Sequence, residues 1–329
     1  MSDFTHPEVQ KMGNISDLMI KHITLLAIVF TSSISCSNSF PEPTPITAEE
    51  LASEHEEWRS KREKRLVTPP GGPVLWYGLF EIGQGETGFG SDPSLSITLP
   101  TEDSPPSAGT LVRTKQEVIL HTNTGAEIYL EDGTPIEDKI VLKNNRSENT
   151  TYLSLGSLGM RIHSEPGTDR LWLRVWKTKL DENQVFKLPE FFTVSTEWLV
   201  PARLKRYSSP RPLPLADVTG GMIEKEAIGE LVFSKNNLEH RLIVTGNKKS
   251  KSYFVSMWDS TAITDTYQSG RYLSVPKVNK DGWTTIDFNR AYNPPCVFTE
   301  FSVCSLPPPD NRLKLSVTAG EKRPDRPYY

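Results

Sequence analysis

Residues 270–322 read GRYLSVPKVNKDGWTTIDFNRAYNPPCVFTEFSVCSLPPPDNRLKLSVTAGEK, and this is the most distinctive stretch of the chain. It combines two cysteines, two runs of adjacent prolines and a dense set of Arg, Asp, Asn and Tyr side chains. An irregular segment carries this many specific groups when it builds a binding site or locks a fold. We therefore expect the other segments to be organised around it.

Composition limits the class of protein. The chain has 329 residues, of which 36% are hydrophobic and 24% charged, so it can form a packed core and is not largely disordered. That length allows one large domain or two ordinary ones. The net charge of −4 and the isoelectric point near 6.0 argue against a nucleic-acid-binding protein, which normally carries a basic stripe. Twenty-six prolines favour strands and turns over helices.

Residues 19–35 have the features of a bacterial export signal. A short basic segment at 19–22 precedes an apolar run at 23–30, which is too short for a membrane-spanning helix. Small residues then lead into Cys36, and the sequence SISC at 33–36 resembles the lipobox of lipoprotein signals. The alternatives are an ordinary signal peptide and a short buried helix.

The lipoprotein interpretation predicts how the amino-terminal region is arranged. Residues 1–18 would be a non-native leader upstream of the true start, and Cys36 would be acylated after cleavage. Residues 36–46, rich in Ser and Pro, would form an extended tether. The membrane is then the expected partner, through a lipid anchor at Cys36, on the periplasmic or surface side of the cell envelope.

One helix is expected, over residues 47–68. Thr47 and Glu50 form a capping-box pattern, and the acidic first half and basic second half suit the helix dipole. The side chains that share one face at helical spacing, with Trp58 as the expected anchor against the body, are Leu51, His55, Trp58 and Arg62.

The region 69–207 is expected to form an antiparallel β-sandwich, because short strand patterns alternate there with turn signals. Within it, GFGSD at 88–92 followed by ITL at 97–99 resembles the start of a forkhead-associated sandwich. That family binds phosphothreonine through an Arg after the glycine and a Ser-x-x-His turn. Here Ser91 follows the glycine, and 104–107 read SPPS. The resemblance implies the fold and not phosphopeptide binding.

A second antiparallel β region is expected over residues 208–329. The proline-rich segment SSPRPLP at 208–214 is interpreted as the boundary before it. Strand patterns follow at 229–233, 240–244 and 253–258.

The segments GRYL, DGWTTIDFNRAYNPPCVFTEFSVCSLPPPDNRL and AGEK closely resemble the bacterial domain-of-unknown-function family 1684. The segments WYGLFEIGQGETGFGSDPSLSITLP, RLWLRVW and WDSTAITDTYQSGRYL are similar to its earlier parts, so the resemblance covers about residues 48–322. Ser305 departs from the family pattern, which has Pro after the second cysteine. The family is uncharacterised, so the resemblance implies an architecture and no activity.

Cys296 and Cys304 are separated by seven residues, and we expect them to form a disulfide in an exported protein. Closing so short a loop would contribute about 2–3 kcal/mol. With Cys36 lipidated, this pairing accounts for all three cysteines. The alternative is a redox or metal site, but zinc takes about four ligands and the nearest histidine is His240.

Residues 287–295, DFNRAYNPP, are the strongest site candidate. Arginines there can hold an anion, asparagines can orient a polar ligand, a tyrosine can cover it, and Asp287 can act as a general base. Alternatively, such side chains hydrogen-bond backbone groups to fix an irregular chain path. The ligand-binding candidates are Arg271, Asp287, Asn289, Arg290, Tyr292, Asn293, Asn311 and Glu321.

No known catalytic signature occurs: there is no G-x-S-x-G, H-E-x-x-H or P-loop. The leading hypothesis is an envelope lipoprotein that binds a small polar or anionic ligand, or a partner, at the loop formed by Arg271 and residues 287–293. The alternatives are a hydrolase-like enzyme with Asp287 as base, and a purely structural envelope protein. No cofactor, metal or nucleic-acid partner is expected.

Overall fold

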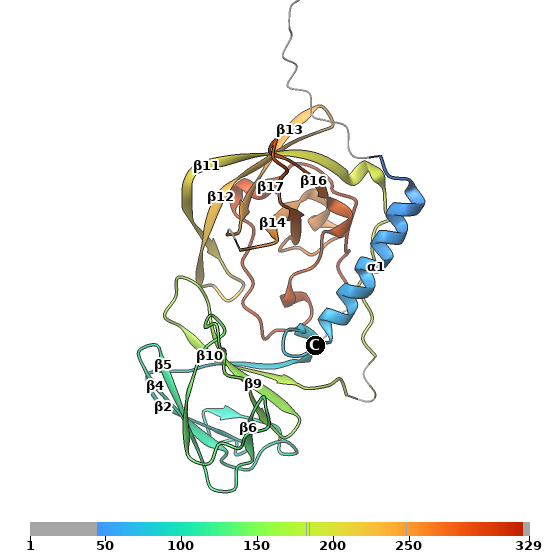
Figure 1. The fold of residues 1–329 in the computed structure, drawn as a ribbon. Helices are drawn as coiled ribbons and strands as arrows, with labels where there is room; N and C mark the ends of the chain where they lie inside the picture. Colours follow the sequence, from blue (N-terminus) through green and yellow to red (C-terminus); the bar gives the residue numbers. More distant parts are fainter. Residues whose placement is uncertain (1–44, 182, 184, 248, 325–329) are drawn as a thin grey trace, which may run out of the picture. The chain divides into compact units, whose positions relative to one another are not determined.

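The computed structural model describes residues 45–181, 183, 185–247 and 249–324, which belong to one unit by their contacts. The expected leader, the signal and Cys36 lie outside the described residues, as does most of the tether. Within the described part the fold is mostly β, with antiparallel sheets and one α-helix (Figure 1). No helix in this part is both long enough and apolar enough to cross a membrane.

Helix α1 spans Ala48–Leu66, in agreement with the predicted capping box. The backbone N–H of Glu50 donates to Thr47 Oγ1 at 3.1 Å, and the backbone N–H of Thr47 donates to Glu50 Oε2 at 2.9 Å. These two bonds satisfy donors that a helix start leaves open. The buried face of α1 consists of Leu51, His55, Arg62 and Leu66.

The expected sandwich is confirmed as two five-stranded sheets. The first has the order β1 (Trp76–Glu81), β10 (Leu171–Lys177), β9 (Leu158–Ser164), β8 (Leu153–Leu155), β6 (Ile128–Leu130). The second has the order β3 (Ile97–Thr98), β2 (Gly85–Gly90), β4 (Gly109–Thr114), β5 (Glu117–Thr122), β7 (Lys139–Leu142). Pairing is antiparallel apart from β2 with β3. Alternate apolar side chains of both sheets meet in one core, as the two-residue period of strands requires.

The second β region is also confirmed. Its sheet has the order β15 (Arg271–Pro276), β14 (Ser252–Asp259), β13 (Leu238–Thr245), β12 (Met222–Lys235), β11 (Leu199–Ala216), β16 (Trp283–Asp287). β17 (Arg312–Leu313) pairs in parallel with β14. The two end strands β15 and β16 contact each other, so the sheet curls into a nearly closed barrel. Both strands lie within residues 270–322, where no strand was expected.

The rest of that stretch fills the curled sheet (Figure 1). Its buried apolar side chains, which share one core with the strands, include Phe288, Ala291, Leu313, Leu315, Val317 and Ala319. The backbone is irregular here and is interrupted by short 3₁₀ turns. The 3₁₀ segments of the described chain are η1 (Pro73–Leu75), η2 (Thr196–Trp198), η3 (Ser260–Ile263), η4 (Phe288–Arg290), η5 (Pro295–Val297) and η6 (Pro309–Asn311).

The proline-rich segment 208–214 is not a boundary, contrary to expectation. It lies inside β11, which continues for 18 residues. Only residues 199–203 of β11 pair with β16, so the later part of the strand has β12 on one side and no named strand on the other. Proline, which has no N–H, is tolerated in a strand with one open side. A register shift between Arg206 and Arg211 accommodates the irregular start of this segment.

A buried arginine joins the sandwich to the terminal stretch. Arg174 of β10 is 1% exposed, and its Nη1 donates to the carbonyl oxygen of Phe301 at 2.5 Å. Its guanidinium also lies 3.9 Å from the centre of the Trp76 ring. Burial lowers the pKa of Arg174 to about 9. This long side chain therefore fixes the stretch against the sandwich while its charge is covered by an aromatic face.

Candidate functional site

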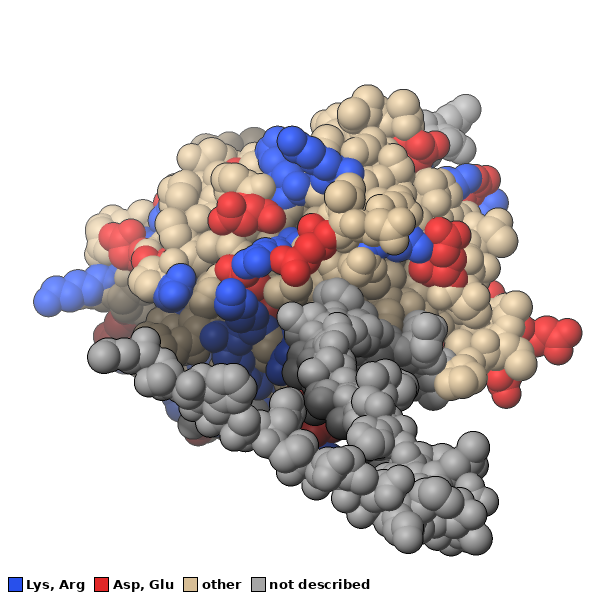
Figure 2. Space-filling view, turned by 90° about the horizontal axis from the view of Figure 1, so that it is seen from above, with Lys and Arg blue, Asp and Glu red and all other residues tan. Residues whose placement is uncertain are grey.

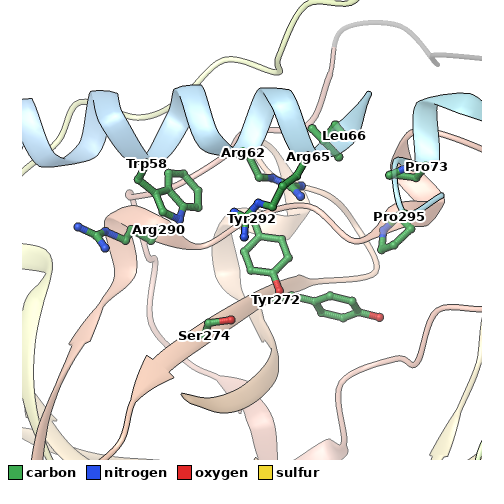
Figure 3. Close-up of a pocket in the computed structure, with 11 residues that line it drawn as sticks. Trp58, Arg62, Arg65, Leu66, Pro73, Tyr272, Ser274, Arg290, Tyr292 and Pro295 are labelled. Carbon is green, nitrogen blue, oxygen red and sulfur yellow. The ribbon is translucent and has the colours of Figure 1, made fainter. Parts of the chain in front are cut away.

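The best-formed pocket with convergent charged groups lies between α1 and the terminal stretch and has a volume of about 410 Å³. In Figure 3, Arg62 and Arg65 extend from α1 toward the Tyr292 ring, and Arg290 lies beside Trp58 with its guanidinium directed away from that ring. We call it the arginine pocket. Its lining residues are Trp58, Arg62, Arg65, Leu66, Gly71, Pro73, Tyr272, Ser274, Arg290, Tyr292 and Pro295. None of these lining residues is acidic.

Arg62 fixes α1 against the terminal stretch. Its Nε lies 2.8 Å from Oε1 of Glu321, and its Nη2 donates to the carbonyl oxygen of Asn293 at 2.9 Å. Glu321 is fully buried and also accepts the backbone N–H of Asn293 at 2.6 Å. The Arg62 guanidinium stacks over the rings of Tyr292 and Phe298, with centroid distances of 4.7 and 5.5 Å. Two of its nitrogens are thus committed to the protein, and its Nη1 is not.

A glycine lets Glu321 reach this position. Gly320 has a φ of +80°, which favours glycine, and a Cβ there would collide with the carbonyl oxygen of Ala291. The next backbone N–H, that of Glu321, donates to the same oxygen at 2.8 Å. The sequence AGEK therefore brings a carboxylate under α1 by a close backbone approach.

Arg290 is held by two carboxylates. Its Nη2 donates to Glu54 Oε2 at 3.2 Å, and its Nε lies 2.9 Å from Asp287 Oδ2. Asp287 caps η4 and accepts both the backbone N–H and the side-chain amide of Asn289 at 3.0 Å. Burial raises the pKa of Asp287, although the Asn289 hydrogen bonds and the Arg290 charge act in the opposite direction. Asp287 positions Arg290 and is not itself among the lining residues.

Two hydroxyl groups contribute to the pocket wall. The hydroxyl of Tyr292 and the side chain of Ser274 of β15 both line the pocket. Burial raises the pKa of Tyr292, and the Arg62 charge opposes this shift. The neighbouring Tyr272 directs its hydroxyl to the carbonyl oxygen of Ser305 at 3.0 Å, so it offers the pocket its ring. The Tyr272 and Tyr292 rings meet edge to face, with centroids 6.1 Å apart.

Arg65 differs from the other two arginines. It lies in the last turn of α1, is exposed, and forms no ion pair with any residue that the structure describes. Since Arg62 and Arg290 each have a carboxylate partner, the charge of Arg65 is the one left unmatched in the pocket. Its guanidinium is therefore free to meet a ligand.

The structure places the other predicted ligand residues inside the fold. Arg271 is 1% exposed; its Nη2 lies 2.8 Å from Asp259 Oδ2 and donates to the carbonyl oxygen of Val317 at 3.0 Å. Its Nη1 donates to the carbonyl oxygen of Ala319. Arg271 thus holds the last segment of the terminal stretch across the barrel and does not reach the pocket.

The three asparagines also hold backbone. Asn289 bonds both the N–H and the carbonyl of Ser195 at 3.0 Å. Asn311 accepts the N–H of Ile243 at 2.6 Å and donates to the carbonyl oxygens of Ile243 and Ser256, which places it between two strands. The amide of Asn293 donates to the carbonyl oxygen of Lys322 at 2.8 Å. Of the eight candidates, only Arg290 and Tyr292 line the pocket.

Comparison with known proteins identifies the terminal half of the chain. Residues 184–322 match the family described as "Protein of unknown function (DUF1684)". This match covers the carboxy-terminal part of the chain. The match begins at residue 184, whereas the sequence resemblance was expected to start near residue 48. The matched residues include the barrel and the terminal stretch.

The chain is also similar to solved structures. The solution NMR structure of an uncharacterized protein of Haloarcula marismortui is 26% identical, covering 42% of this chain and 77% of that one, with a TM-score of 0.36. No curated protein matches this chain.

The prediction of a disulfide between Cys296 and Cys304 is wrong. Cys296 and Cys304 are free thiols, both buried, and the backbone N–H of Cys296 donates to Cys304 Sγ at 3.2 Å. Hydrogen bonds from the Cys296 thiol and from Ser302 lower the pKa of Cys304, whereas the pKa of Cys296 is raised. The pair is thus held by hydrogen bonding. Among the described residues, no group of three or more His, Cys, Asp or Glu side chains is placed to hold a metal.

Sequence reasoning missed the helical half of the pocket. Trp58, Arg62, Arg65 and Leu66 fall on one face of α1, a signal that helical periodicity carries. The basic second half of α1 was interpreted only as matching the helix dipole. Only the fold reveals that this face lines a pocket together with Tyr292 and Arg290, which lie more than 200 positions further along the chain.

Proposed function

We propose that this protein binds a small anionic ligand in the arginine pocket. The main support is the convergence of Arg62, Arg65 and Arg290 on one pocket whose described lining contains no acidic side chain. Planar guanidinium groups recognise carboxylates and phosphates through paired hydrogen bonds. A pocket of about 410 Å³ lies within the range of small-molecule sites, roughly 300–1,000 Å³.

The pocket is also preorganised. Arg62 is fixed by Glu321 and Asn293, and Arg290 is fixed by Asp287 and Glu54. Groups that are already held lose little conformational entropy when a ligand binds. This favours binding over a purely structural role for this part of the surface.

The surface charge is consistent with a small ligand. On the face in Figure 2, basic and acidic side chains are interspersed, with no single large basic field. A polyanion would call for such a field. A hydrolytic role for Asp287 gains no support from the geometry, because both its oxygens are engaged and it does not line the pocket.

We further propose that the protein is an exported, lipid-anchored protein of the cell envelope. The support is the signal pattern at residues 19–35 and the lipobox-like SISC before the Ser/Pro tether. In cells fed labelled palmitate, the wild type should carry label and partition with membranes. A Cys36→Ala variant should lose both properties, and a variant that keeps them would refute lipidation at this residue.

Binding can be tested by calorimetry and thermal shift with the full-length protein. The probes are benzoate, phenyl phosphate and inorganic phosphate at low ionic strength. At least one should bind and raise the melting temperature of the wild type. Arg65→Gln should weaken that binding about tenfold or more, because it removes a charge-assisted hydrogen bond.

The matched control is Lys64→Gln, which removes one positive charge from the same helical turn at an exposed residue outside the pocket lining. It should leave affinity nearly unchanged. Equal losses in both variants would indicate a diffuse charge effect and would contradict a site at Arg65.

A further inference from the structure

We infer that the ligand of the arginine pocket is a monocarboxylate carried on a small flat or apolar body. This inference rests on the proposed function and narrows it. The charge that the pocket leaves unmatched, the geometry of its free donors and the apolar part of its wall each support it.

The first step is the charge count. Glu321 faces Arg62 at 2.8 Å, and Asp287 faces Arg290 at 2.9 Å, so these two pairs are close to neutral. Glu54 also contacts Arg290 at 3.2 Å, but its side chain is 58% exposed, so water screens its charge. Arg65 supplies the remaining full positive charge. The C-terminal carbonyls of α1, which ends at Leu66, add partial negative charge nearby. A monoanion balances this site, whereas a dianion would leave excess negative charge beside the buried carboxylate of Glu321.

The second step is the donor geometry. Arg65 offers a whole guanidinium fork, and Arg62 retains Nη1 after its bonds to Glu321 and Asn293. The Ser274 and Tyr292 side chains also line the pocket, and a hydroxyl can donate or accept a hydrogen bond to a ligand. A planar fork matches the two oxygens of a carboxylate in one plane. The three equivalent oxygens of a phosphate would need more free donors than these.

The third step is the apolar wall. Trp58, Leu66, Pro73 and Pro295 line the pocket together with the Tyr272 ring. The Trp58 ring is held edge to face against Phe191 at a centroid distance of 6.0 Å, so its orientation is fixed. Figure 3 places Leu66, Pro73 and Pro295 on one side of Arg62 and Arg65, and Trp58 on the other side, beside Arg290. An apolar body attached to the carboxylate would be covered here and lose contact with water.

Four probes separate these features on the full-length wild type: benzoate, phenyl phosphate, benzamide and acetate, at about pH 8 and low salt. Phenyl phosphate is then a dianion, because the second pKa of a phosphate ester is about 6. Benzoate should bind about tenfold tighter than phenyl phosphate and than acetate. Benzamide, the uncharged isostere, should not bind measurably. Arg65→Gln should remove the advantage of benzoate over benzamide, with circular dichroism to verify its fold.

The failures of the two proposals can be told apart. Tighter binding of phenyl phosphate than benzoate would overturn the monocarboxylate inference and leave anion binding intact. Equal affinities for benzoate and acetate would overturn the apolar body. If neither benzoate nor phenyl phosphate binds the folded protein at millimolar concentration, the inference fails. If inorganic phosphate does not bind either, the proposed function fails as well.

Discussion

Replacing Glu321 by Gln tests whether the buried pair with Arg62 fastens α1 to the barrel. Glu321 is fully buried and Arg62 is 9% exposed, with the two charges 2.8 Å apart. Removing one partner of a buried pair leaves the other charge uncompensated, which costs about 3–5 kcal/mol. A glutamine also turns an N–H₂ group toward the donors that Glu321 accepts, Arg62 and the Asn293 N–H. We expect the lower end, about 3 kcal/mol, because Arg62 borders the pocket.

The matched control is Glu81→Gln. Glu81 also pairs with an arginine through two bonds, to Arg170 Nε at 3.2 Å and Nη2 at 3.0 Å. That pair is 53% and 37% exposed, so the same chemical change should cost at most about 1 kcal/mol. Urea denaturation of both variants, extrapolated to water, measures the difference. A loss for Glu321→Gln no larger than that for Glu81→Gln would refute the clamp.

A second measurement locates the effect. If Arg62 anchors α1, Glu321→Gln should speed amide hydrogen exchange in α1 more than in the sandwich core. Replacing both partners by methionine removes the uncompensated charge, so it should restore part of the lost free energy of unfolding. Stability that falls further in the double variant would mean that packing, and not charge, dominates this contact.

Three further predictions concern other buried groups. Burial lowers the pKa of His55 from its usual 6.5, so the folded state binds fewer protons than the unfolded state as pH falls below that value. Stability should therefore fall as the pH drops from about 7 toward 5, and His55→Gln should show a shallower fall in melting temperature over that range; identical slopes would contradict this. Asn311→Ala removes three hydrogen bonds between strands and should cost about 2–4 kcal/mol in urea denaturation, whereas a change below about 0.5 would exclude a structural role. Alkylation in denaturant without reductant should label both Cys296 and Cys304 by peptide mass spectrometry, and a cross-linked peptide would contradict the free thiols.

Local sequence patterns correctly predicted the helix and the β regions, because these depend on residues that are close in sequence. The capping box of Thr47 and Glu50 located the start of α1, and strand patterns located both β regions. A boundary was wrongly expected at residues 208–214 because proline usually marks a turn. These residues lie in the later part of β11, where one side of the strand has no strand partner and proline is tolerated. β15 and β16 were missed because the polar residues that follow them dominated the interpretation of the whole stretch.

The site was harder to predict because it depends on contacts between distant segments. The loop 287–295 was recognised by composition, and it supplies Arg290 and Tyr292. Composition could not show that Arg290 and Tyr292 line a pocket whereas Arg271 and Asn289 hold backbone groups, because the same residue type can play either role. Burial separates them: Arg271 is 1% exposed, whereas the side chain of Arg290 is 35% exposed.

The two interpretations of the terminal stretch, a locked fold and a binding site, turn out to depend on each other. Glu321 must be buried for Arg62 to be held, and Arg62 must be held for its guanidinium to cover Tyr292 and form one wall of the pocket. Asp287 is half-buried beside Asn289, and it forms an ion pair with Arg290. The internal hydrogen bonds thus position cationic groups that would otherwise be flexible. Arg65 alone lacks such support, which is why a ligand that binds here should order Arg65 more than any other lining side chain.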